Sequence, residues 1–178
     1  LKVPYIQMHI RREVEQMHQP QTYRNIEIEV AQELATQMAA ARKAGITDVV
    51  ADPGFGFSKS ADETLKIWDH EKVLADAVWV IRQYQPDIII ARFPPDKRAG
   101  HGHHTASAII AQEAFVAAAD PAKFPEQFKY GVQPWQAKRI VWNTFNFGGN
   151  NTTNNNQLKM DIGVYNALLG KSYGRSEE

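Results

Sequence analysis

The stretch that decides the fold reads Ile46-Thr47-Asp48-Val49-Val50-Ala51-Asp52-Pro53-Gly54-Phe55-Gly56-Phe57. Its first six residues predict a short strand, and the Asp-Pro-Gly sequence then breaks regular structure. An aspartate at the carboxyl end of a strand is well placed to bind a ligand, because ligands of open α/β sheets bind outside those ends. An aspartate in such a position also commonly caps the backbone of its own loop. Both interpretations stay open for Asp52.

The residues before this stretch predict a helix and an earlier strand. Between residues 23 and 44, apolar side chains recur at spacings of three and four, and Gly45 follows. This pattern is typical of an amphipathic helix that ends at a glycine. Residues 3–10 read as a buried strand. The order strand, helix, strand predicts a βαβ unit with parallel strands.

The same alternation continues downstream. We expect helices at 69–84 and 104–119, and strands at 87–92 and 139–142. The fold class is therefore α/β, and we predict a three-layer, Rossmann-like domain with a mostly parallel sheet of four or five strands. Residues 145–157, rich in glycine and asparagine, predict a loop. A last strand at 158–162 and a short helix at 164–169 follow.

Composition excludes several classes of function. The 178 residues carry 20 basic and 20 acidic side chains, so nothing suggests a nucleic-acid footprint or an anionic membrane partner. There is no cysteine, which excludes disulfides and thiolate metal sites. We expect a soluble protein with no membrane span and no signal peptide, and the compartment stays open between cytoplasmic and exported, in a bacterial type of cell. Because the sequence starts at Leu1, we expect a processed or excised piece.

Three of the six histidines lie in Gly100-His101-Gly102-His103-His104. This stretch follows a predicted strand, a position from which many α/β proteins present metal ligands. If a helix begins near His101, then His101 and His104 share one face. A functional zinc site needs at least three protein ligands, so others must come from elsewhere in the chain. Solvated loop histidines are the alternative.

Residues 1–57 resemble dihydropteroate synthase, a pterin-binding family. The motifs that carry this resemblance are Met8-His9, Ala44-Gly45-Ile46 and the Asp-Pro-Gly-Phe-Gly-Phe run at 52–57. It implies part of a (β/α)₈ barrel, in which Asp52 hydrogen-bonds a pterin ring and Phe57 lies near the aminobenzoate side. Arg12 and Val14 stand where the family usually has glycine and proline. Its Ser-Arg-Lys-Ser and Arg-x-His motifs do not occur in this sequence.

Residues 57–174 resemble the LmbE/PIG-L family of zinc-dependent N-acetylglucosaminyl deacetylases. The matching runs are 85–93, 100–105, 124–127, 133–136 and 168–173. This resemblance implies a hydrolase of N-acetylated amino sugars with a Zn²⁺ cofactor. His101 would be the catalytic acid or oxyanion stabiliser, and His104 a zinc ligand. The family's His-Pro-Asp-Asp motif, which supplies two zinc ligands and the general base, is missing, so we expect an impaired enzyme.

The two resemblances meet at Gly56-Phe57-Ser58-Lys59, which both families share. We therefore predict a chimera, with a βαβ segment at 1–57 and a second segment at 58–178 in one compact domain. If the strands share a sheet edge, His9, Asp52 and His104 would converge and rebuild a metal site. Three hypotheses remain: an impaired deacetylase, a pterin-binding fragment, and a chimeric α/β domain without activity. The expected ligand is a small molecule, and the oligomeric state is open.

Overall fold

The computed structural model describes residues 4–19, 21–147, 150–159 and 165–172. The chain divides into two compact units, residues 1–144 and residues 145–178. The first unit holds every α-helix described and both pairs of parallel strands. It therefore contains all of the predicted site residues.

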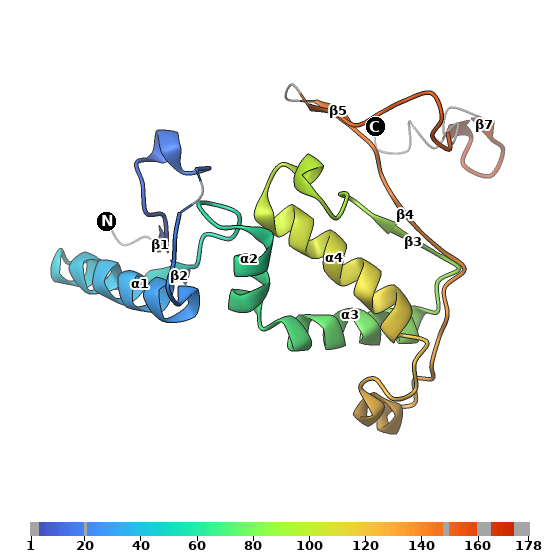
Figure 1. The fold of residues 1–178 in the computed structure, drawn as a ribbon, viewed down its shortest axis with the longest axis horizontal. Helices are drawn as coiled ribbons and strands as arrows, with labels where there is room; N and C mark the ends of the chain where they lie inside the picture. The colour runs from blue at the N-terminus through green and yellow to red at the C-terminus, as the bar shows by residue number, and fades with distance from the viewer. Residues whose placement is uncertain (1–3, 20, 148–149, 160–164, 173–178) are drawn as a thin grey trace. The chain divides into compact units, whose positions relative to one another are not determined.

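The first βαβ unit is confirmed. Strand β1 (Tyr5–Met8) pairs in parallel with β2 (Val49–Asp52), and helix α1 (Ile26–Lys43) connects them (Figure 1). Met8 is in register with Asp52, and the next residue, His9, donates its backbone N–H to the Asp52 carbonyl over 2.8 Å. His9 and Asp52 thus lie together at the carboxyl edge of this sheet.

Helix α1 has the signals that its sequence predicts. Asn25 caps the first turn by accepting from the Ile28 N–H, and acidic and basic residues occupy the first and last turns respectively. Its buried side chains, Ile26, Val30 and Leu34, pack with Tyr23 and Ile67. Gly45, with φ +88°, follows the C-cap in the left-handed region that glycine favours.

Helix α2 (Ala61–Trp68) is an element that the sequence patterns above do not predict. A capping box begins it: the Ser60 hydroxyl accepts from the Glu63 N–H over 3.2 Å, and the Glu63 carboxylate accepts from the Ser60 N–H over 2.7 Å. A Ser-x-x-Glu spacing ahead of a helix is the sequence signal for this motif. Asp69, in the left-handed conformation, separates α2 from α3 (His70–Tyr84).

The second strand pair is also parallel. Strand β3 (Ile88–Ala91) pairs with β4 (Arg139–Trp142), and α4 (Gly102–Ala117) lies between them in sequence. Helices α3 and α4 form the largest buried cluster, in which Leu74, Val78 and Ile81 meet Ile110 and Ala114. The small alanines of α4 allow the two helices to pack closely.

The mixed α/β class is confirmed, whereas the predicted three-layer Rossmann-like sheet is not. Within the described residues, β1–β2 and β3–β4 are separate two-stranded sheets. Apolar strand residues stay open to solvent in both pairs, among them Ile6 at 64% and Ile90 at 66% exposure. The prediction of parallel strands was correct, and the prediction of a single shared sheet is not supported.

The remaining elements are short. Three 3-10 helices, η1 (Val14–Gln16), η2 (Lys97–Ala99) and η3 (Pro125–Tyr130), lie in the first unit. In the described part of the second unit, β5 (Asn146–Phe147) pairs antiparallel with β6 (Asn150–Asn151), and β7 (Tyr165–Asn166) pairs antiparallel with β8 (Lys171–Ser172). The prediction of a helix at 164–169 is wrong for residues 165–169, which form a strand and a turn. The strand predicted at 158–162 lies mostly outside the described residues.

None of the helices in the described part of the chain has the length and apolar character that crossing a membrane requires.

Candidate functional site

Asp52 ends strand β2, and the 53–60 loop starts from it. One carboxylate oxygen, Oδ1, accepts a hydrogen bond of 2.8 Å from the Gly54 N–H. This is the loop-capping role that the sequence allows for an aspartate before Pro-Gly. Among the described residues, no hydrogen bond is made by Oδ2. Capping therefore uses one oxygen of a half-buried carboxylate and leaves the second without a hydrogen bond to any described residue.

Gly54 brings the 53–60 loop against the end of β1. Its φ is +65°, and a Cβ built on it would lie 2.2 Å from the His9 carbonyl oxygen. Both facts require glycine, because an L side chain would be strained and would collide with backbone. The loop is thus fixed at the sheet edge by close backbone approach.

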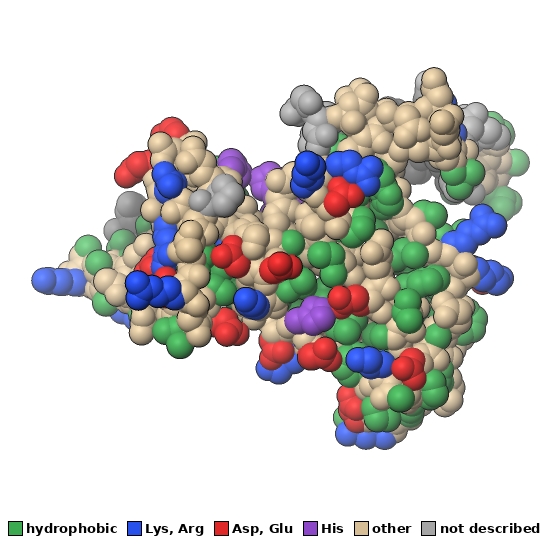
Figure 2. Space-filling model, viewed as in Figure 1, with side chains coloured by type: hydrophobic (Ala, Val, Ile, Leu, Met, Phe, Trp, Pro, Cys, Tyr) green, Lys and Arg blue, Asp and Glu red, His purple; other side chains and the backbone are tan. Residues whose placement is uncertain are grey.

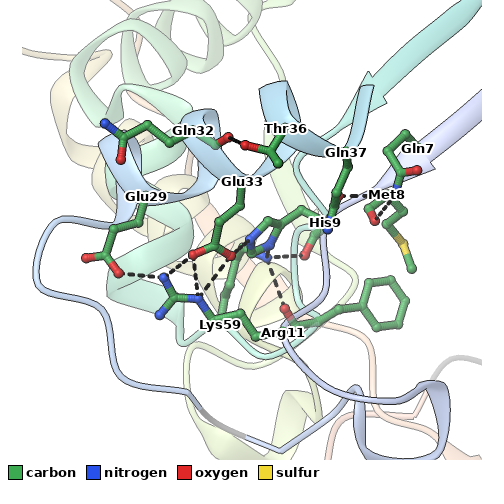
Figure 3. Close-up of polar contacts among 12 residues, drawn as sticks. Gln7, Met8, His9, Arg11, Glu29, Gln32, Glu33, Thr36, Gln37 and Lys59 are labelled. Carbon is green, nitrogen blue, oxygen red and sulfur yellow. Dashed lines mark hydrogen bonds and ion pairs between the residues drawn. The ribbon is translucent and has the colours of Figure 1, made fainter. Parts of the chain in front are cut away.

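A buried hydrogen-bond network fixes the other end of the loop (Figure 3). The Lys59 ammonium lies 3.0 Å from His9 Nδ1 and donates to the carbonyls of Gly54 and Phe57, both over 3.1 Å. His9 Nε2 lies 2.8 Å from a Glu33 carboxylate oxygen on α1. Burial lowers the pKa of Lys59 to about 8 and also lowers the pKa of His9. The network ties β1, α1 and the loop into one structure.

Arg11 completes this network, which we call the Lys59–His9–Glu33 network. Its guanidinium donates to the carboxylates of Glu29 and Glu33 and to the Thr22 carbonyl, and it lies 4.0 Å from the Tyr23 ring centroid. The hydrogen bond from Arg11 is the largest cause that lowers the pKa of Glu33. Glu33 is therefore an anion that accepts a hydrogen bond from the Nε2–H of neutral His9.

The histidines of the 100–104 stretch gather at the start of α4. His101 is the N-cap residue, and its ring centroid lies 5.1 Å from that of His104 and 5.7 Å from that of His103. His18, from a segment more than 80 residues earlier, packs edge-on against His101 with centroids 4.8 Å apart. Figure 2 shows histidine side chains at the surface on the side of the molecule that it draws. Desolvation and neighbouring imidazoles lower the pKa of His101 and of His103.

Phe57 belongs to the same neighbourhood. Its ring lies 5.4 Å from His18 and 6.5 Å from His101, centroid to centroid. The structure therefore brings together Phe57 and His101, which the sequence assigned to two different sites. Beside them is a cavity of about 460 Å³, whose lining includes His18, His101 and Lys59 and does not include Asp52.

The residues present do not fit a zinc site. In the part of the chain that the structure describes, no three His, Cys, Asp or Glu side chains are arranged to hold a metal ion. His104 Nδ1 lies 3.1 Å from the Ala99 carbonyl, and its ring stacks on Phe93 at 3.8 Å. Both nitrogens of His9 face Lys59 and Glu33. His9, Asp52 and His104 are not brought together as a metal-holding group, and we derive no step through zinc.

Residues 1–114 match the family described as pterin binding enzyme. The chain belongs to this family. No curated protein matches the chain. The family match runs past residue 57 and through most of α4, and the comparisons give no support to an LmbE/PIG-L segment or to a chimera.

Sequence reasoning missed the residues that hold the candidate site in place. No sequence motif groups these residues, because they come from three separate segments: Arg11, Glu33 and Lys59. Lys59 appears only inside the Gly-Phe-Ser-Lys run. The one available signal was the position of Lys59, two residues beyond Phe57 in the loop. A lysine that is buried there needs hydrogen-bond acceptors close by.

Proposed function

We propose that this protein binds a pterin at the carboxyl end of β2, and that Asp52 is the residue that recognises the ring. The observation that carries the proposal is the half-buried Asp52 carboxylate, with Oδ1 held by the Gly54 N–H, in a chain that belongs to the pterin binding enzyme family. Such a carboxylate is pre-oriented before the ligand arrives, which reduces the cost of binding.

The chemistry of the ligand matches this group. A pterin presents a ring N–H and an exocyclic amino group side by side, and together they resemble one edge of a guanidinium. A carboxylate accepts from two such parallel donors, and ionised acceptors make the stronger hydrogen bonds. Asp52 thus discriminates in favour of rings that carry an adjacent pair of donors.

Phe57 has the second role in this proposal. It stands five residues beyond Asp52 in the same loop, and its backbone carbonyl is held by Lys59. An aromatic side chain gives a flat ligand apolar contact area at low cost in conformational entropy. We assign Phe57 to the wall of the site, where it would lie beside the substituent on the pterin ring.

The test is a fluorescence titration of the protein with pterin. Asp52→Asn keeps an oxygen that can accept from the Gly54 N–H, so the loop stays capped, but it replaces an acceptor by an NH₂ donor that faces the donors of the pterin. We expect the variant to weaken binding at least about tenfold. Asp48→Asn is the matched control, because Asp48 is exposed and four residues upstream of Asp52; its affinity should equal that of the unaltered protein. Equal affinity in Asp52→Asn, or no pterin binding by the unaltered protein, would refute the proposal.

Deacetylation of N-acetylated sugars, the function that the second resemblance implies, is not carried forward. The family match supports the pterin interpretation, and His104 is the only matched zinc ligand of that resemblance.

A further inference from the structure

Lys59 holds the loop that carries both residues of the proposed pterin site. It is 5% exposed, and its ammonium donates to the carbonyls of Gly54 and Phe57 over 3.1 Å each. The Gly54 N–H caps Asp52 Oδ1 over 2.8 Å, and Phe57 is the residue assigned to the wall of the site. One buried cation therefore fixes the backbone next to both of the residues that meet the ligand in that proposal.

The path from Lys59 to Asp52 is short. The ammonium is bonded to the carbonyl of Gly54, and the N–H of the same residue is bonded to the Asp52 carboxylate. Gly54 itself is confined by β1, because a Cβ built on it would lie 2.2 Å from the His9 carbonyl oxygen. Asp52 is also one of the charges that act on Lys59 through space. A change at the ammonium therefore reaches Asp52 both through one glycine and through the electric field.

The contacts of Lys59 need its charged form. An ammonium has three N–H donors, and His9 Nδ1 and the two carbonyls use one each. A neutral amine has only two donors and a lone pair. The Gly54 carbonyl also accepts from the Phe57 N–H, whereas His9 Nδ1 and the Phe57 carbonyl have Lys59 as their one donor among the described residues. Deprotonation therefore either breaks a contact that has no substitute or turns the lone pair toward the Gly54 carbonyl.

Charged and titratable groups face Lys59 from every element packed against it. They lie at the ends of β1 and β2, just beyond β1, on α1 and on α2: His9, Asp52, Arg11, Glu33 and Glu63. Burial is the largest cause of the lowered pKa of Lys59, about 8; Arg11 acts in the same direction, and the three carboxylates oppose it. Burial also lowers the pKa of His9 from 6.5, so this histidine is already neutral when Lys59 loses its proton.

We propose that Lys59 is a positioning residue of the pterin site, whose ammonium keeps Asp52 and Phe57 in the arrangement that binds the ring. The inference rests on the proposed function. It makes pterin and the proton of Lys59 favour each other, because a coupling between two ligands is reciprocal. A ring bound over Asp52 also excludes water from the carboxylate, which strengthens its attraction for the ammonium.

The first test uses the unaltered protein with ¹³C-labelled lysine and follows the Cε resonances against pH, with and without pterin. Exposed lysines titrate near about 10.4, so Lys59 is recognised by its lower pKa. Saturation with pterin should raise the pKa of Lys59 from about 8 to about 9. An unchanged pKa overturns the inference, because a lysine that only stabilises the fold does not respond to the ligand.

The second test measures the dissociation constant of pterin against pH. For the unaltered protein, affinity should fall at least about fivefold from about pH 7 to about pH 9.5, as Lys59 loses its proton. Lys59→Met should bind about tenfold more weakly at about pH 7 and approach the unaltered protein as the pH rises. Lys66→Met, at an exposed lysine of α2, is the matched control and should follow the unaltered protein. Titration of the pterin itself enters all three curves equally.

The outcomes separate the two proposals. Parallel curves for Lys59→Met and the unaltered protein overturn the positioning role of Lys59. Pterin binding that depends on Asp52 but not on the charge of Lys59 overturns this inference alone. Absence of pterin binding by the unaltered protein overturns both the inference and the proposed function.

Discussion

Lys59 donates a hydrogen bond to His9, with 3.0 Å between Nζ and Nδ1. The accepting nitrogen must be unprotonated, so the proton of His9 is on Nε2, which faces Glu33 at 2.8 Å. The three donors of the ammonium are therefore all used, one by His9 and two by the carbonyls of Gly54 and Phe57. This relationship makes the end of β1 and the 53–60 loop depend on each other.

Removing the ammonium should destabilise the protein. Lys59→Met keeps most of the volume of the side chain but leaves His9 Nδ1 and the Phe57 carbonyl oxygen without a donor, whereas the Gly54 carbonyl still accepts from the Phe57 N–H. Burying a lysine is costly, yet orphaned buried acceptors cost about 1–3 kcal/mol, so we expect a net loss of about 2 kcal/mol. Urea unfolding measures it. Lys66→Met, at an exposed position in α2, should change stability by less than about 0.5 kcal/mol. An equally stable Lys59→Met would show that the network contributes nothing net.

Stability should rise with pH between 8 and 9.5 because of the same lysine. The pKa of Lys59 is about 8 in the folded protein, below its ordinary value of 10.5, because of burial. In this window the unfolded chain holds a proton that the folded chain has released, so raising the pH favours folding, by about 1.5 kcal/mol. Tyr23, whose pKa burial raises to about 12, acts in the opposite direction only above pH 10. Urea midpoints of the unaltered protein and of Lys59→Met should therefore diverge as the pH rises. Parallel curves would contradict the assignment to Lys59.

The local elements could be predicted from the sequence, and their partners could not. The spacing of apolar residues between 23 and 44 determines the buried face of α1, and Gly45 marks its end. Residues that are close in sequence are therefore sufficient to predict this helix. Which strands share a sheet depends on contacts between distant segments. Short apolar runs in the sequence are compatible with two separate parallel pairs and also with one four-stranded sheet. The sequence pattern therefore does not distinguish the two arrangements.

The candidate site, too, could be predicted from the sequence only in part. Asp52 could be singled out from the sequence as a candidate, because it stands between a predicted strand and Pro-Gly. The support from Arg11, Glu33 and Lys59 could not, because it requires knowing that α1 packs over the end of β1. The proximity of His18 and His101 is likewise a product of the fold alone.

Gly54 should be far less tolerant of alanine than another glycine that has a positive φ. Gly131 also has a positive φ, of +91°, but a Cβ built on it meets nothing within 4 Å. Gly131→Ala should therefore cost about 1 kcal/mol for backbone strain alone. Gly54→Ala adds a collision with the His9 carbonyl, and we expect a loss of about 3 kcal/mol together with weaker pterin binding. Thermal unfolding of both variants measures the difference. Equal losses would mean that the loop moves away from β1 without cost.

Arg82 is the largest of the fully buried side chains, and its removal should have the greatest effect on the first unit. The guanidinium, 1% exposed, donates to five backbone carbonyls at and beyond the end of α4, among them Asp120 at 2.8 Å and Lys123 at 2.9 Å. Four of these carbonyls, those of Ala117, Ala118, Asp120 and Phe124, also accept a backbone N–H. The guanidinium therefore adds a second donor at the C-terminal end of α4, where a cation is favourable. Arg82→Met should cost about 3–5 kcal/mol, because the buried hydrogen bonds of the guanidinium to the five carbonyls and to the Gln127 side chain are lost and the methionine cannot replace them. Arg24→Met, at an exposed arginine, should stay within about 0.5 kcal/mol of the unaltered protein. Chemical unfolding monitored by the tryptophan fluorescence of the first unit checks both. A loss below about 1 kcal/mol for Arg82→Met would mean that water replaces the guanidinium at the end of α4.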